Sequence, residues 1–154
     1  MNIGDPVPPI QFKATSGIHT TFGHYHGAWL VIYFYPKDAT SGCTTEGCDF
    51  RDYDKEFSFL NTTIFGVSRD SLSSHEKFKS KQDFPFELIS DGDEMLCNAF
   101  DVIKQKSMYG KEYMGIERST FIVDPQGIIR HIWRNVKVKG HVDEVLSVLK
   151  SLCN

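Results

Sequence analysis

The sequence predicts an α/β domain of three layers, with a central mixed β-sheet flanked by helices and an N-terminal β-hairpin. Two observations lead to this prediction. Short apolar runs rich in β-forming residues alternate with helical patterns along most of the chain, and the chain closes with a second hairpin and an amphipathic helix. The 154 residues contain no repeat, linker or low-complexity stretch, so we expect a single domain over residues 1–154.

The N-terminal part of the chain predicts a hairpin and then a central strand. Residues 10–22 alternate in polarity around Ser16-Gly17, which is typical of two short strands joined by a tight turn. The run from Trp29 to Tyr35 is continuously apolar, which indicates a strand buried on both faces. Pro36 has no backbone N–H to donate, so we expect the strand to end there.

A single amphipathic helix is expected over residues 44–60, followed by a second buried strand over residues 62–67. The helix is indicated by apolar side chains that recur at spacings of 3, 4 and 3 and share one face: Phe50, Tyr53, Phe57 and Leu60.

The middle of the chain predicts a polar helix, a short strand and a second short helix. Ser73 and Glu76 have the spacing of a capping box, which predicts the start of a helix that ends near Gln82. The strand is expected over residues 86–89, and the second helix is expected to run from a capping residue, Asp91, to Phe100.

The last part of the chain predicts a loop, a hairpin and a final helix. Residues 104–117 are rich in Lys, Gly and Tyr and predict a loop. Two β-rich runs, 120–123 and 128–133, flank the turn sequence Asp-Pro-Gln-Gly and predict a hairpin. Regularly spaced Val and Leu over residues 142–152 predict an amphipathic helix.

Composition and charge exclude several classes of function. The chain is 40% hydrophobic and 24% charged, which is typical of a globular protein, and its net charge of −3 offers no bulk attraction to nucleic acid or anionic lipid. The longest apolar run, Ala28 to Tyr35, is far too short to cross a membrane. No secretory signal begins the chain, so we expect a cytoplasmic protein.

Four cysteines, Cys43, Cys48, Cys97 and Cys153, are too few for a disulfide-stabilised scaffold. In a reducing compartment, each cysteine would by default be a small buried hydrophobic residue. Cys43 and Cys48 depart from this default because they lie five residues apart in a Gly- and Thr-rich junction after the predicted central strand.

The position of Cys43 favours a reactive thiolate. The first turn of a helix has unpaired N–H groups and a partial positive charge, and both stabilise an anionic sulfur. Extending the apolar stripe of the helix backwards through Gly47 predicts that Cys43 faces inward. Thr40 can place a hydroxyl in the same space, and Pro36 can shield it. Arg118, at the start of a strand expected in the same sheet, is the candidate cation.

Cys48 cannot reach Cys43 while the helix is intact. Residues five apart in a helix have Cα atoms separated by roughly 8.6 Å, whereas a disulfide tolerates about 7 Å. A disulfide between them therefore requires the first turns to unwind, and Gly47 weakens the helix there by about 1 kcal/mol relative to Ala. Such a cycle is suited to peroxide reduction, in which Cys43 becomes a sulfenic acid that condenses with Cys48.

Residues 33–52 resemble the active-site segment of the Q-type peroxiredoxins, also called bacterioferritin comigratory proteins. This segment reads Tyr-Phe-Tyr-Pro-Lys-Asp-Ala-Thr-Ser-Gly-Cys-Thr-Thr-Glu-Gly-Cys-Asp-Phe-Arg-Asp. The family's proline, threonine, attacking cysteine, resolving cysteine and arginine fall on Pro36, Thr40, Cys43, Cys48 and Arg118. The resemblance extends over nearly the whole chain.

The resemblance implies a thioredoxin-like fold and a thioredoxin-dependent, atypical two-cysteine peroxidase that acts without a cofactor or metal. It also implies hydrogen peroxide and alkyl hydroperoxides as substrates, thioredoxin or a similar dithiol as reductant, and a monomer. The side chains of Thr40 and Arg118 and the amide of Cys43 would bind the peroxide. One departure is Ser41, where the family usually has a proline, so we expect a looser loop before Cys43.

Two other functions remain open at the level of the sequence. The same residues would serve a peroxide sensor that passes its disulfide to a partner protein. Cys43 and Cys48 could instead be half of a zinc site, although the six histidines show no paired ligand spacing apart from His24-x-His26, which we interpret as a turn.

The remaining candidate residues have simpler interpretations. Cys97 is interpreted as a core residue rather than an alternative resolving cysteine, and Cys153 as a free thiol near the end of the chain. Glu46 is expected to lie near the helix start, close enough to contact Arg118 or assist proton transfer.

Overall fold

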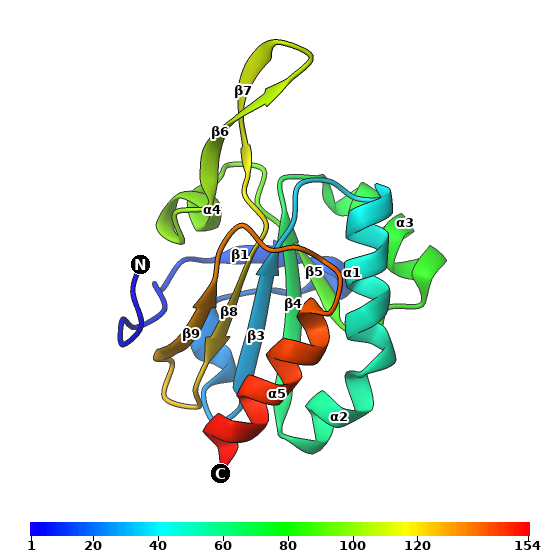
Figure 1. The fold of residues 1–154 in the computed structure, drawn as a ribbon. Helices are drawn as coiled ribbons and strands as arrows, with labels where there is room; N and C mark the ends of the chain where they lie inside the picture. The colour runs from blue at the N-terminus through cyan, green and yellow to red at the C-terminus, as the bar shows by residue number, and fades with distance from the viewer.

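The computed structural model describes residues 1–154 and contains a seven-stranded mixed sheet in the order β2-β1-β5-β4-β3-β8-β9, with a separate two-stranded sheet of β6 and β7 (Figure 1). The strands are β1 (Phe12–Ala14), β2 (His19–Thr20), β3 (Trp29–Phe34), β4 (Thr62–Ser68), β5 (Glu87–Ser90), β6 (Ile103–Met108), β7 (Lys111–Ile116), β8 (Ser119–Val123) and β9 (Ile129–Trp133).

Helices flank the central sheet, which confirms the predicted fold class. The α-helices are α1 (Ser41–Asp52), α2 (Asp54–Phe59), α3 (Leu72–Gln82), α4 (Met95–Ala99) and α5 (His141–Cys153), and the 3-10 helices are η1 (Thr15–Gly17) and η2 (Phe22–Tyr25). None of these helices has the length and apolar character needed to cross a lipid bilayer.

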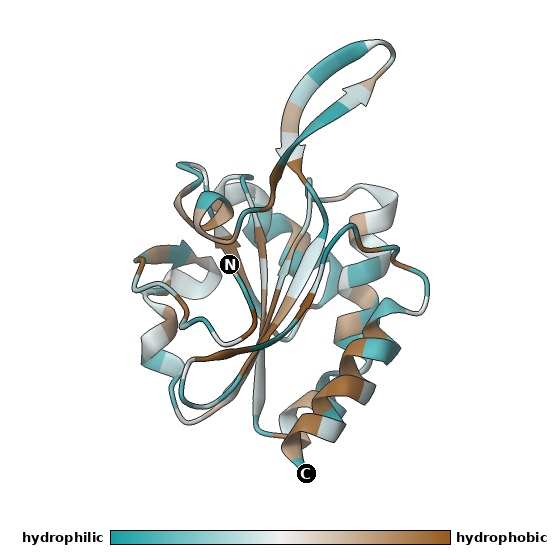
Figure 2. Ribbon diagram, turned by 60° about the vertical axis from the view of Figure 1, so that its left-hand side comes forward, coloured by the Kyte–Doolittle hydropathy of each residue, from teal (hydrophilic) through white to brown (hydrophobic).

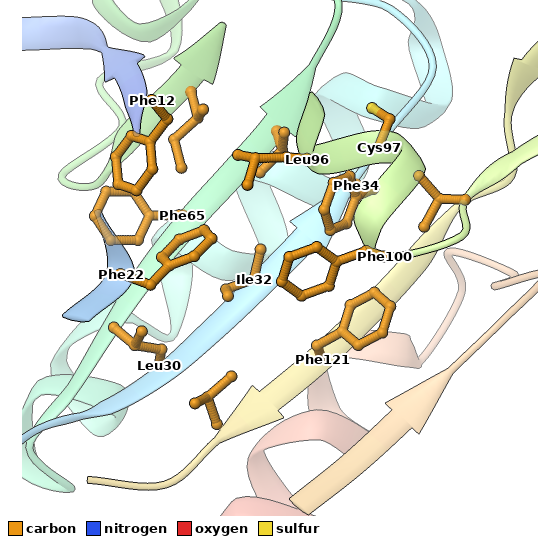
Figure 3. Close-up of a cluster of buried hydrophobic side chains, with 14 of the residues drawn as sticks. Phe12, Phe22, Leu30, Ile32, Phe34, Phe65, Leu96, Cys97, Phe100 and Phe121 are labelled. Carbon is orange, nitrogen blue, oxygen red and sulfur yellow. The ribbon is translucent and has the colours of Figure 1, made fainter. Parts of the chain in front are cut away.

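Strand β3 is central and buried on both faces, as its continuous apolar run predicts. It pairs in parallel with β4 on one side and antiparallel with β8 on the other. Because side chains alternate along a strand, Ile32 and Phe34 join one core cluster while Val31 and Tyr33 join the other. Figure 3 shows the first cluster, in which aromatic rings that lie far apart in the sequence, from Phe12 to Phe121, pack around Ile32.

The two clusters explain why helices are needed on both sides of the sheet. One cluster takes Phe50 from α1, Phe78 from α3 and Leu149 from α5. The other takes Phe22 from η2 and Leu96 from α4. Figure 2 shows the apolar side of α5 as a brown band along the sheet, whereas much of the β6–β7 hairpin is hydrophilic.

The single helix predicted over residues 44–60 is wrong in its bounds, because α1 begins at Ser41 and the chain breaks into α1 and α2 at Tyr53. Asp, Tyr and Asp are weak helix formers in succession, and Tyr53 leaves the helical range at φ −101° and ψ 8°. The apolar stripe survives the break, since Phe50 and Phe57 are both fully buried.

The start of α3 and the structure of residues 104–117 also differ from the prediction. The side chain of Ser71, rather than Ser73, caps α3 by accepting a hydrogen bond from the N–H of Ser74. The predicted loop is instead the β6–β7 hairpin, which projects from the body of the molecule (Figure 1). Its turn places Tyr109 and Gly110 at positive φ, the geometry that matches the twist of a two-residue hairpin turn.

We predict that Phe100→Ala lowers the free energy of unfolding by about 3–5 kcal/mol, the usual cost of removing a buried aromatic ring. Phe100 is fully buried and its ring lies 5.2 Å from Phe34 and 4.9 Å from Phe121, between ring centres. Urea unfolding followed by circular dichroism measures the change. The matched control is Phe59→Ala, because Phe59 is 90% exposed and its loss should change stability by less than about 0.5 kcal/mol.

Candidate active site

Helix α1 places Cys43 in its first turn, beside three backbone N–H groups that have no acceptor. Thr40 is the N-cap residue, and its carbonyl accepts the first helical hydrogen bond, from Thr44 at 2.9 Å. The N–H groups of residues 41–43 precede that bond and stay free. The Cys43 side chain is 2% exposed and faces the core cluster beneath α1, so the sulfur lies where the positive end of the helix meets a sheltered surface.

Arg118 connects the sheet to this helix start. It lies directly before β8, and its Nη2 donates to the sulfur of Cys43 at 3.5 Å while its Nη1 donates to Oε1 of Glu46 at 2.6 Å. Burial alone would lower the pKa of Arg118, but Glu46 and Cys43 together raise it above its ordinary value. The guanidinium is therefore a fixed positive charge shared between a carboxylate and the sulfur.

Glu46 is completely buried, and one of its carboxylate oxygens has no hydrogen-bond partner. Burial raises the pKa of Glu46 to about 7, although Arg118 pulls in the opposite direction. The hydroxyl of Tyr33 is also buried without a partner, and burial followed by the charge of Glu46 raises the pKa of Tyr33. The expectation that Glu46 contacts Arg118 is thus correct, and the contact becomes a full ion pair as the pH rises through about 7.

The structure does not bring the other two predicted residues to the sulfur by a direct hydrogen bond. Thr40 is exposed, and its hydroxyl donates to the carbonyl of Lys37 at 3.0 Å. Pro36 is half-buried and lines a depression of about 370 Å³ together with Arg118 and Lys106.

Cys48 is half-buried on the same unbroken helix, and all four cysteines are free thiols. Its thiol donates to Oε1 of Gln82 at 3.5 Å, away from Cys43. Helix geometry separates the Cα atoms of the two cysteines by roughly 8.6 Å, so this arrangement is the reduced state in which they cannot pair.

Gly47 has a packing role that the sequence did not reveal. A Cβ built at Gly47 would collide with Cζ of Phe84, so the aromatic ring rests directly on the helix backbone. Our interpretation of Gly47 as a device that weakens the helix is therefore incomplete. A Gly47→Ala variant would displace Phe84, and it could not isolate the stiffness of the helix.

Asp38 is the centre of a buried hydrogen-bond cluster that the sequence analysis missed. Its carboxylate accepts from the hydroxyls of Tyr35 at 2.6 Å and Ser74 at 2.7 Å, and it lies 2.7 Å from Nδ1 of His75. Its own backbone N–H donates to Asp70 at 2.9 Å. The loop before Thr40 is thereby tied to Tyr35, which directly follows β3, to α3 and to the segment between β4 and α3.

His75 is fully buried and faces an acceptor at each ring nitrogen, since Nε2 lies 2.9 Å from the carbonyl of Ile89. A carbonyl and an ionised carboxylate have no hydrogen to give, so only a ring that carries a hydrogen on both nitrogens satisfies both contacts. Burial would raise the pKa of Asp38, but the hydrogen bonds and charge of His75, with Tyr35 and Ser74, lower it. The only features of the sequence that could have indicated this cluster were an acidic residue in the junction and a histidine on the apolar side of a helix.

The remaining cysteines lie apart from the site. Cys97 is fully buried, and burial followed by the carboxylate of Asp91 raises its pKa far above that of an ordinary thiol. Asp91 also accepts the N–H groups of Leu96 and Cys97, but the N-cap residue of α4 is Glu94, so the helix predicted from Asp91 to Phe100 is wrong in its bounds. Cys153 is half-buried in the last turn of α5, and burial raises its pKa.

No set of zinc ligands surrounds Cys43 and Cys48. The group of side chains that could hold a metal ion is Asp38, Asp70 and His75, which contains neither cysteine. Its polar atoms already bond to one another and to neighbouring hydroxyls.

We predict that His75→Ala lowers the free energy of unfolding by about 3–5 kcal/mol, because it leaves the Asp38 carboxylate buried without its counter-ion. Urea unfolding at pH 7 measures the loss. Tyr35→Phe is the comparison, since it removes one hydrogen bond to the same carboxylate and should cost about 1 kcal/mol. Equal losses in the two variants would contradict the ion pair.

We also predict that the stability of Glu46→Gln relative to the unsubstituted protein rises with pH. The folded state raises the pKa of Glu46 from 4.5 to about 7, so this carboxyl group stabilises the fold at low pH and loses that contribution as the pH rises through about 7. The difference in unfolding free energy should therefore increase between about pH 4.5 and 7 and then level off.

His141 titrates across the same range with the opposite sign, because burial lowers its pKa from 6.5 to about 4. Its contribution cancels in the difference between the two proteins. A difference that stays flat from pH 4.5 to 7 would show that Glu46 is ionised throughout.

Known proteins with the same organisation place this site in a family. The family model described as AhpC/TSA matches residues 3–132. Peroxiredoxin Bcp of Xanthomonas campestris pv. campestris is 58% identical over 142 residues, covering 92% of this chain and 89% of that protein. Peroxiredoxin Bcp of Bacillus subtilis is 49% identical over 152 residues, covering 99% and 97%.

Solved structures agree with these sequence matches. A Cys-to-Ser mutant of Xylella fastidiosa PrxQ superimposes with a TM-score of 0.95 at 47% identity, covering 100% of this chain and 98% of that one. The bacterioferritin comigratory protein of X. campestris superimposes with a TM-score of 0.90 at 54% identity, covering 94% and 92%. The thioredoxin-like fold implied by the resemblance is confirmed. The chain therefore belongs to the AhpC/TSA family and is a peroxiredoxin of the Bcp type.

Proposed function

We propose that this peroxiredoxin reduces hydroperoxides with Cys43 as the attacking thiolate and Cys48 as the resolving thiol. The observation that carries the assignment is the guanidinium of Arg118, 3.5 Å from the Cys43 sulfur at the start of α1. A half-buried cation and three free N–H groups favour an anionic sulfur at this position over any other cysteine in the chain.

In the first step, the Cys43 thiolate attacks the terminal oxygen of the hydroperoxide. The S–O bond forms as the O–O bond breaks, and the leaving oxygen departs as an alcohol or water after taking a proton. Arg118 and the N–H of Cys43 stabilise the negative charge on the oxygens during this step. The Thr40 hydroxyl donates its hydrogen bond to the backbone carbonyl of Lys37, so its oxygen can accept a hydrogen bond from the O–H of the peroxide.

In the second step, Cys48 attacks the Cys43 sulfenic acid and releases water, which leaves an intramolecular disulfide. Because both residues lie on α1, the helix must unwind between them before the sulfurs can meet. A dithiol protein then reduces the disulfide by exchange and α1 forms again.

We assign thioredoxin or a similar dithiol as the reductant, and hydrogen peroxide and alkyl hydroperoxides as the substrates. The related X. campestris bacterioferritin comigratory protein has an alkyl peroxide reduction activity, which supports the second substrate class. All residues of the proposed cycle come from one chain, so we propose a monomer with one domain over residues 1–154, acting in the cytoplasm.

We predict that Cys43→Ser abolishes peroxide consumption and that Cys48→Ser supports a single turnover, because only the second step needs Cys48. A dimedone-type probe should then trap Cys43 of Cys48→Ser as a sulfenic acid, detected by mass spectrometry. Cys153→Ser is the control and should cycle normally with thioredoxin, thioredoxin reductase and NADPH. Continued turnover by Cys48→Ser would give the resolving role to another thiol.

A further inference from the structure

The half of α1 that carries Cys48 rests on residues 82–84, at the C-terminal end of α3. We call residues 82–84 the seat for α1, and three contacts hold α1 on it. The Cys48 thiol donates to Oε1 of Gln82 at 3.5 Å, and Nη1 of Arg51 donates to the carbonyl of Gln82 at 2.8 Å. The ring of Phe84 lies against Gly47 so closely that no Cβ would fit between them.

Gln82 is suited to this role because it is the last residue of α3. The final carbonyls of a helix have no intrahelical donor, so the Gln82 carbonyl is free to accept from Arg51. Asp83 then turns the chain at φ 53°, and Phe84 follows into the core. One residue thus receives the Cys48 thiol with its side chain and the Arg51 guanidinium with its backbone.

We propose that the seat sets the rate of the resolving step, with Gln82 and Arg51 as positioning residues that hold Cys48 away from Cys43. The inference rests on the proposed function, because it concerns the disulfide between Cys43 and Cys48. That disulfide cannot form until α1 unwinds, and unwinding the segment that carries Cys48 breaks the contacts with Gln82. Each contact that stabilises the seated helix therefore slows disulfide formation.

The seat consequently decides between two fates of the oxidised enzyme. In the first, the Cys48 thiolate attacks the Cys43 sulfur, the S–S bond forms, and the hydroxide that leaves takes up the proton lost by Cys48 to give water. In the second, the sulfenate reacts with another hydroperoxide, which transfers an oxygen and leaves as an alcohol or water, so Cys43 becomes a sulfinic acid. Stronger contacts between the seat and α1 favour the sulfinic acid, and weaker contacts favour the disulfide.

The test separates attack from resolution in the full-length protein. Gln82→Met keeps the length of the side chain but removes the acceptor for the Cys48 thiol, and Arg51→Met removes the contact to the Gln82 carbonyl. Rapid mixing with peroxide, acid quenching and alkylation would give the rate of disulfide formation and the yield of sulfinic acid by mass spectrometry. The rate of peroxide attack comes from competition with a second peroxidase.

We expect disulfide formation to be about threefold faster in Gln82→Met and about tenfold faster in Arg51→Met, since a hydrogen bond to a charged group is worth more than one from a thiol. The sulfinic acid yield should fall in both variants, while the rate of peroxide attack stays unchanged. Arg51→Lys should restore part of the slower resolution. Lys81→Ala, an exposed neighbour on α3, should behave as the unsubstituted protein.

Resolution at the original rate, or slower, in both Met variants would overturn the proposal. A resolving rate that moves together with the attack rate would also overturn it, because it would indicate general loosening of the fold. The failure of the proposed function has a different signature, namely a disulfide that mass spectrometry maps to a pair other than Cys43 and Cys48.

Discussion

The site depends on one half-buried guanidinium that serves two partners. Arg118 donates to the carboxylate of Glu46 at 2.6 Å and to the sulfur of Cys43 at 3.5 Å. The ion pair holds the cation in place, and the weaker contact presents it to the sulfur. Since both partners are on α1 and Arg118 precedes β8, the same interaction docks the start of the helix on the sheet. The interaction that stabilises an anionic Cys43 sulfur is therefore the same one that fixes the position of α1.

In the proposed cycle, helix α1 has to satisfy two opposite demands. It is folded when Cys43 receives the free N–H groups of its first turn, and it would have to open for Cys48 to reach Cys43. The structure separates these demands in space. The Asp38 cluster holds the loop before the helix, whereas residues 82–84 hold the part that carries Cys48. The contacts of the Asp38 cluster and the contacts of residues 82–84 can thus differ in strength independently of each other.

Local patterns predicted the parts of this protein that depend on neighbouring residues. The apolar run of β3, the inward direction of Cys43 and the terminal helix follow from periodicity alone, and the motif around Cys43 identified the family. The ion pair of Asp38 and His75 and the contact of Gly47 with Phe84 join residues more than thirty positions apart, so no local pattern contains them. The hairpin around Tyr109 was missed because its turn depends on backbone twist rather than on an alternating apolar pattern.

The pairing of β3 on both edges limits how far the opening of α1 can spread. The strand is hydrogen-bonded to β4 along its length and to β8 from Leu30 to Phe34, so the chain is fixed up to the point where the loop begins. In the proposed cycle, what opens is a short helical segment attached to a strand that is paired on both edges. Recovery of the resting enzyme after each reduction would then be a local coil-to-helix transition, a process that takes about a microsecond or less in isolated peptides, rather than refolding of the domain.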